Sequence, residues 1–114
     1  IGGDAAGMSA ASQVKRQRPD WSVIVLEQGH YVSYAACGMP YYVGGLIEEF
    51  DQLVEITPQV FREKRGIDLR LGHRAIAIDP AVRTVACRRT DGAEDTLDYD
   101  ELLIATGARP LVPA

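Results

Sequence analysis

The chain has 114 residues, of which 46% are apolar, and its formal net charge is −4. A chain of this length forms at most one domain, and its mixed charges indicate a globular protein without a nucleic-acid-binding patch. The longest apolar runs, residues 22–26 and 102–105, are far below the roughly 18 to 20 residues of a membrane span, and nothing resembles a secretion signal, so we expect a cytoplasmic protein without membrane contact.

The first quarter of the sequence predicts a β-α-β unit. Residues 5–18 combine small and helix-favouring residues with basic residues near the end, and Pro19 stops the helix. Residues 21–27 are a short β-branched apolar run of the kind buried in a parallel sheet. The helix is preceded by a glycine turn at Gly2 and Gly3, although such turns normally follow a buried strand. We therefore expect that most of the first strand is missing.

The hexapeptide Gly2-Gly3-Asp4-Ala5-Ala6-Gly7 is typical of a dinucleotide-binding turn. The first glycine allows the tight bend, the last lets helix and strand pack closely, and the helix N-terminus faces a pyrophosphate. Asp4 replaces the usual middle glycine, so the motif is imperfect, and an ordinary glycine turn is the alternative. Glu27 lies about twenty residues beyond the turn, where a carboxylate can accept hydrogen bonds from a ribose. Turn and acid together favour a nucleotide site, which by itself fits FAD or NAD.

The rest of the chain predicts one helix, a small antiparallel sheet and a final strand. Thr57 is the expected N-cap of a helix that begins at Pro58 and runs to residue 64. Three runs of β-forming residues separated by turn signals predict an antiparallel meander, at residues 68–71, 73–78 and 84–88. Residues 102–105 (LLIA) predict one more buried strand, which ends at Thr106-Gly107. These elements indicate an α/β fold.

The two cysteines, Cys37 and Cys87, lie in unlike surroundings and form neither a C-x-x-C pair nor a Cys/His cluster, so no metal site is predicted. Pro40 can begin a short helix that Gly44 closes, which would place Cys37 just before a helix N-terminus, where the dipole lowers the pKa of a thiol. A buried, inert cysteine is the alternative for Cys37. Cys87 lies within a predicted strand and is expected to be structural.

Residues 33–45, SYAACGMPYYVGG, are the most specific stretch of the chain. They resemble the S-[FY]-x-x-C-G-x-P-Y segment of coenzyme A-disulfide reductases and of related persulfide reductases, NADH oxidases and peroxidases. These enzymes form the single-cysteine branch of the pyridine nucleotide-disulfide oxidoreductases, and Tyr42 stands where relatives with a C-x-x-x-x-C pair have a second cysteine. Residues 99–110 resemble the second flavin-contacting motif of flavoproteins with two dinucleotide domains. The resemblance covers essentially the whole chain.

The resemblance implies an α/β fold, a truncated Rossmann-like FAD-binding domain with a small antiparallel β-meander, over residues 1–114. In full-length relatives an NAD domain and a dimerisation domain follow, so the fragment alone is expected to be inactive and the full-length form a homodimer. NAD(P)H is the implied electron donor. The resemblance and the turn together assign FAD contacts to the following residues: Gly2, Gly3, Ala5, Ala6, Gly7, Glu27, Ala105, Thr106 and Gly107.

The resemblance also implies that Cys37 is catalytic and receives electrons through the flavin while it forms a disulfide with a small thiol. Coenzyme A disulfide, or a related persulfide, is the implied substrate. Its expected contacts are Ser9, Gln13, Arg16 and Ser33, with Arg65 a further candidate, and a polar helix face is the alternative explanation for these residues. Many coenzyme A-disulfide reductases have Asn directly before the cysteine, whereas this chain has Ala36. Two other functions remain open, an NADH oxidase or peroxidase with a cysteine sulfenic acid and a flavin-binding module in which Cys37 is idle.

Overall fold

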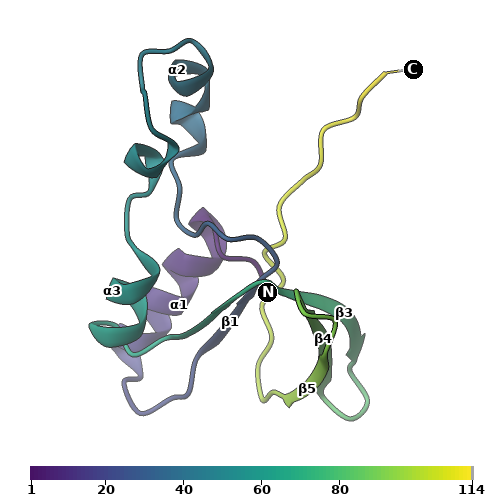
Figure 1. The fold of residues 1–114 in the computed structure, drawn as a ribbon. Coiled ribbons are helices and arrows are strands. Elements are labelled where there is room, and N and C mark those ends of the chain that lie inside the picture. Colours follow the sequence, from purple (N-terminus) through teal and green to yellow (C-terminus); the bar gives the residue numbers. More distant parts are fainter. Residues whose placement is uncertain (114) are drawn as a thin grey trace.

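Two small sheets organise the described part of the chain, residues 1–113 of a computed structural model (Figure 1). Helix α1 (Ala5–Gln17) leads to strand β1 (Ile24–Glu27), which pairs in parallel with β2 (Asp68–Leu71). The second sheet is an antiparallel meander of β3 (His73–Asp79), β4 (Thr84–Arg89) and β5 (Glu94–Asp98). No helix within residues 1–113 is long and apolar enough to cross a membrane.

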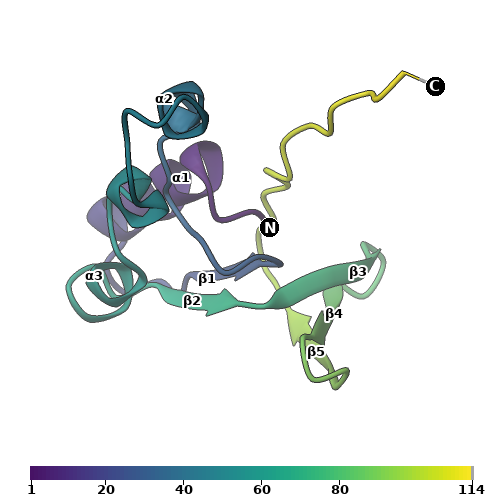
Figure 2. The ribbon, with the colours of Figure 1, turned by 45° about the horizontal axis from the view of Figure 1, so that its top comes forward.

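The segment between β1 and β2 contains two short helices and two 3₁₀ turns. Its elements are a 3₁₀ turn (Ala36–Gly38), α2 (Met39–Val43), a second 3₁₀ turn (Phe50–Leu53) and α3 (Pro58–Glu63). Figure 2 shows α1, α2 and α3 on one side of the parallel pair, whereas the meander continues from the end of β2 and lies away from the helices.

The predicted helix boundaries are confirmed, because local chemistry determines them. In α3 the Thr57 hydroxyl accepts a hydrogen bond from the Val60 N–H at 3.4 Å and Pro58 occupies the first turn, where its missing N–H costs nothing. Gly66 follows with a φ of +63°, a left-handed conformation that glycine adopts without strain. Helix α1 ends at Gln17 with Lys15 and Arg16 in its last turn, where cations interact favourably with the helix dipole.

The predicted meander was wrong in one strand. Residues 68–71 pair in parallel with β1, with Leu69 opposite Val25, and do not join the antiparallel sheet. The side chains of Leu69 and Val25 are both buried against the helices, so β2 belongs to the core of the β-α-β unit. The third strand of the meander is instead β5, Glu94–Asp98, whose sequence EDTLD contains one apolar residue and no strong β signal. Its Leu97 is opposite Val85 of β4.

The predicted buried strand at residues 102–105 was also wrong, although its place in the sheet is recognisable. Leu103 and Ile104 are 52% and 60% exposed, and residues 102–105 do not form a β-strand. The Ile1 amino group donates to the Leu103 carbonyl at 2.7 Å, and the Ala105 N–H donates to the Ile1 carbonyl at 2.8 Å. These two hydrogen bonds have the pattern of a parallel β-ladder, but both of them are made to the same residue, Ile1. Gly2 in turn donates to the Leu26 carbonyl at 2.9 Å, so residue 1 lies between β1 and residues 103–105.

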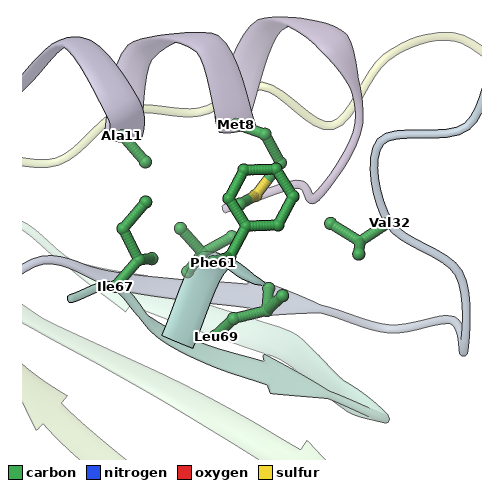
Figure 3. Close-up of a cluster of buried hydrophobic side chains, with 7 residues drawn as sticks. Met8, Ala11, Val32, Phe61, Ile67 and Leu69 are labelled. Carbon is green, nitrogen blue, oxygen red and sulfur yellow. The ribbon is translucent and has the colours of Figure 1, made fainter. Parts of the chain in front are cut away.

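Two apolar clusters stabilise these layers. In the first, Met8 and Ala11 of α1 pack over the β1–β2 pair, with Phe61 of α3 between helix and sheet (Figure 3). Phe61 is 1% exposed, and complete burial of such a side chain contributes about 1.5 to 3 kcal/mol. The second cluster joins Leu26 of β1 to Val85 and Cys87 of β4 and thereby attaches the meander to the parallel pair.

Phe61→Ala should lower the free energy of unfolding by about 3 to 5 kcal/mol, because it leaves a cavity between α1 and the sheet. The measurement is urea unfolding followed by circular dichroism. Val82→Ala is the control, since Val82 is 65% exposed and its truncation should change stability by no more than about 0.5 kcal/mol. Equal effects of the two substitutions would show that this cluster is not the core.

Candidate functional site

The glycine turn before α1 is packed too closely for side chains, as its sequence predicted. Gly2 has a φ of +113°, and a Cβ added there would overlap the Ala105 carbonyl. A Cβ at Gly7 would overlap the Gly2 carbonyl, so the helix and the turn meet backbone to backbone. Ala5 and Ala6 are exposed in the first turn of α1. The helix N-terminus is therefore open to an anionic group.

Glu27 ties this turn to the end of β1. Its Oε2 accepts a hydrogen bond from the Gly3 N–H at 2.8 Å, and its Oε1 accepts one from the Gly29 N–H at 2.7 Å. An ionised carboxylate has about four acceptor positions. Glu27 therefore orients the turn and keeps acceptor capacity for a hydroxyl donor such as a ribose.

The segment after residue 104 meets the same turn. Ala105 lies against Gly2 and Gly7, and its N–H donates to the Ile1 carbonyl. Thr106 is exposed, and Gly107 has a φ of +69°, which bends the chain away from the sheet. The structure thus brings the three groups of predicted cofactor contacts to one end of β1: the turn, Glu27 and residues 105–107.

Cys37 is an exposed free thiol in the loop that precedes α2. The predicted short helix is confirmed, with Pro40 in its first turn and Gly44 as C-cap. The Ala35 N–H donates to the Leu53 carbonyl at 2.7 Å, and a Cβ at Gly38 would press against the Leu53 side chain. The returning 3₁₀ turn therefore supports the backbone around the thiol. Cys87 is 0% exposed in the second core cluster, as expected of a structural cysteine.

Aromatic side chains pack against one another and close this loop. The Phe50 ring lies 4.4 Å from Tyr31, 6.0 Å from Tyr34 and 5.6 Å from Tyr42, measured between centroids. Tilted and edge-on pairs at these distances add to the stabilisation from buried area. The density of aromatic residues in this segment is typical of a packed loop.

A pocket of about 200 Å³ lies between α1, α3 and the start of the Cys37 loop. Four of the five predicted substrate contacts, Ser9, Arg16, Ser33 and Arg65, are among the residues that line it: Ala5, Met8, Ser9, Ser12, Arg16, Ser33, Ile56, Phe61 and Arg65. Gln13 is adjacent, because its Oε1 accepts hydrogen bonds from Arg16 Nε and Nη2 at 3.1 and 2.6 Å.

The two arginines of this pocket are bound by neutral groups. Arg65 Nη1 donates to the Ser12 hydroxyl at 2.8 Å, and Arg16 is held by the Gln13 amide. Within residues 1–113 neither forms an ion pair, whereas the following arginines each contact a carboxylate: Arg18, Arg70, Arg88 and Arg89. The pocket therefore keeps two positive charges that suit a phosphate or another anion. Ser12 was not predicted as a site residue, although its spacing from Ser9 and Arg16 places all three on one face of α1.

Ser33 links the pocket to the glycine turn through its backbone. It has a φ of +52°, which is uncommon for a residue with a side chain. Its N–H donates to the Gly3 carbonyl and its own carbonyl accepts from the Glu55 N–H, both at 2.9 Å. Strained residues held in this way concentrate at functional sites.

Comparison with known proteins identifies the family of this chain. The family model for pyridine nucleotide-disulphide oxidoreductases matches residues 1–114. An NAD(P)H coenzyme A polysulfide/persulfide reductase of Pyrococcus horikoshii is 49% identical over 114 residues, which are 100% of this chain and 25% of that protein. A coenzyme A disulfide reductase of Staphylococcus haemolyticus is 34% identical over 95% of this chain and 25% of its own length. An NADH oxidase of Methanocaldococcus jannaschii is 33% identical over 99% of this chain and 25% of its own length.

The fold has a close counterpart among solved structures. An NAD-dependent persulfide reductase from A. fulgidus superposes with a TM-score of 0.92 at 47% identity, over 99% of this chain and 21% of that chain. The fold of residues 1–113 is therefore the Rossmann-like, FAD-binding type found in these oxidoreductases. The chain spans about a quarter of the length of the curated relatives that it matches.

The left-handed backbone of Ser33 gives a stability prediction. Ser33→Val should be about 1 to 2 kcal/mol less stable than Ser33→Gly, because a β-branched residue is strained at positive φ and glycine is not. The measurement is the difference between the two unfolding midpoints in urea. Ser22, which is exposed and has no positive φ, offers the matched pair Ser22→Val and Ser22→Gly. A Ser33 pair no further apart than the Ser22 pair would contradict the conformation described here.

Proposed function

Because this chain belongs to the pyridine nucleotide-disulphide oxidoreductases, we propose that it is the FAD-binding part of an NAD(P)H-dependent coenzyme A-disulfide or persulfide reductase. The observation that supports this substrate is the pocket in which Arg16 and Arg65 keep their charges free of carboxylates. Coenzyme A ends in phosphate groups, which two guanidinium groups can bind through charge-assisted hydrogen bonds. In our proposal these groups anchor the substrate, and Cys37 reacts with its sulfur.

The residues around the glycine turn fit FAD. The open N-terminus of α1 would face the pyrophosphate, with Gly2, Gly3 and Gly7 permitting its close approach. Glu27 would accept a hydrogen bond from the ribose. The backbone of Ala105, Thr106 and Gly107 would contact the cofactor as well. FAD, when bound, supplies the two-electron relay between a nicotinamide and a disulfide.

Cys37 is the nucleophile in our proposal. Its thiolate attacks one sulfur of coenzyme A disulfide, a sulfur–sulfur bond forms between Cys37 and one coenzyme A, and the second coenzyme A leaves as a thiolate. Two electrons then restore the Cys37 thiolate and release the bound coenzyme A. Cys87 cannot resolve this mixed disulfide, because it is fully buried in the cluster that attaches the meander. The electrons must therefore come from outside the cysteines of this chain.

We further propose that the full-length protein is a cytoplasmic homodimer. Both cysteines are free thiols, the state that a reducing cytoplasm maintains. Exposed apolar side chains around α2, among them Tyr41, Val43 and Leu46, support a contact with another protein surface at this loop.

Cys37→Ser in the full-length protein should abolish NADH-dependent reduction of coenzyme A disulfide and leave flavin absorbance intact, because a hydroxyl cannot form the disulfide intermediate. Activity is followed by loss of NADH absorbance. Cys87→Ala is the control and should retain activity, because Cys87 serves only packing in our proposal.

Two results would decide against the proposal. Full reductase activity in Cys37→Ser would exclude the thiol mechanism. Rapid NADH oxidation by oxygen, with no reduction of coenzyme A disulfide, would favour the oxidase, in which Cys37 passes through a sulfenic acid.

A further inference from the structure

Ser12 is a pocket residue whose hydroxyl is bound to a charged group across the fold. It lies on α1, on the face shared by Ser9 and Arg16, and is 5% exposed. Its Oγ accepts a hydrogen bond from Arg65 Nη1 at 2.8 Å, although the two residues are 53 positions apart in the sequence. The contact therefore joins α1 to the end of α3.

Arg65 is held at a second point by Phe61. The guanidinium carbon lies 5.1 Å from the centre of the Phe61 ring, within the range of a cation–π contact. Phe61 is itself fixed in the core between α1 and the parallel pair (Figure 3). The Phe61 ring and the Ser12 hydroxyl together favour one orientation of the Arg65 side chain, which is long and flexible without such contacts.

The neutral partner preserves the charge of Arg65. A guanidinium group has five N–H donors, of which Ser12 engages one. A carboxylate at this place would neutralise the charge, as it does for Arg70, which Asp68 contacts at 2.7 Å. With a serine, the remaining donors stay available to an anion in the pocket.

We propose that Ser12 is a positioning residue that orients Arg65 toward a phosphate of coenzyme A and so favours phosphorylated over phosphate-free thiol substrates. This inference rests on the proposed use of the pocket as a coenzyme A site. Ser12 acts through Arg65 and does not touch the reacting sulfur.

The experiment is a double-mutant cycle on the full-length enzyme with Ser12→Ala, Arg65→Ala and both together. Ser12→Ala should raise the KM for coenzyme A disulfide about tenfold, the value of a hydrogen bond to a charged group, with kcat unchanged. Arg65→Ala should raise it at least as much, and the double variant should match Arg65→Ala, because Ser12 has no effect without Arg65. Ser12→Thr, which retains the hydroxyl, should restore most of the affinity.

A second substrate separates positioning from folding. The disulfide of pantetheine lacks the phosphates, so the ratio of kcat/KM for coenzyme A disulfide to that for pantetheine disulfide should fall in Ser12→Ala and in Arg65→Ala. The Ser22→Ala variant should keep the wild-type ratio. Ser22→Ala is the matched control, since Ser22 is exposed and makes no side-chain hydrogen bond within residues 1–113. Alanine is the better helix former, so Ser12→Ala should keep α1 intact.

Additive effects in the double variant, or equal losses with both substrates, would overturn the inference and leave the reductase function standing. So would an unchanged KM in Arg65→Ala, because the phosphates would then bind elsewhere. A wild-type enzyme that does not reduce coenzyme A disulfide would overturn the proposed function and this inference with it.

Discussion

Gly3 is held from both sides, and the arrangement of the site depends on these two bonds. Its N–H donates to Glu27 at the end of β1, and its carbonyl accepts from Ser33 at the start of the Cys37 loop. The first bond fixes the glycine turn against the strand, where a dinucleotide can reach the N-terminus of α1. The second fixes Ser33 in a left-handed conformation at the wall of the pocket. One glycine thus connects the dinucleotide-type turn to the wall of the pocket that Ser33 lines.

The arginine side chains of this chain differ in the charge of their partners. Arg18, Arg88 and Arg89 lie in exposed ion pairs, which contribute about 0 to 1 kcal/mol each to stability. Arg16 and Arg65 instead use an amide and a hydroxyl as their partners. Such contacts orient a guanidinium group without cancelling its charge, and they are useful when a ligand supplies the negative charge.

The sequence was most informative where a single residue determines local geometry. The cap at Thr57, the close packing of Gly2 and Gly7, and the short helix begun at Pro40 all depend on neighbours near in the chain. Strand pairing is a long-range property, which explains why residues 68–71 were placed in the wrong sheet and why the polar strand β5 was missed. Ser12 was missed for the same reason, since its partner Arg65 comes from another helix end. One pocket contains Ser9, Arg16, Ser33 and Arg65. Their common location was predicted from the family resemblance and not from the residues themselves.

The position of the two thiols limits the chemistry that this chain can perform. Cys87 is sealed between β1 and the meander, in a cluster with Leu26 and Val85, whereas Cys37 lies in an exposed loop supported by Leu53 and the Phe50 aromatic cluster. An intramolecular disulfide would require one of these segments to leave its packing, and the buried apolar contacts of Cys87 oppose that movement. A disulfide formed at Cys37 therefore needs a sulfur from outside residues 1–113. The pocket that Ser33 shares with Arg16 and Arg65 carries two guanidinium groups without carboxylate partners, and in our proposal these groups bind the anionic end of the small thiol that supplies this sulfur.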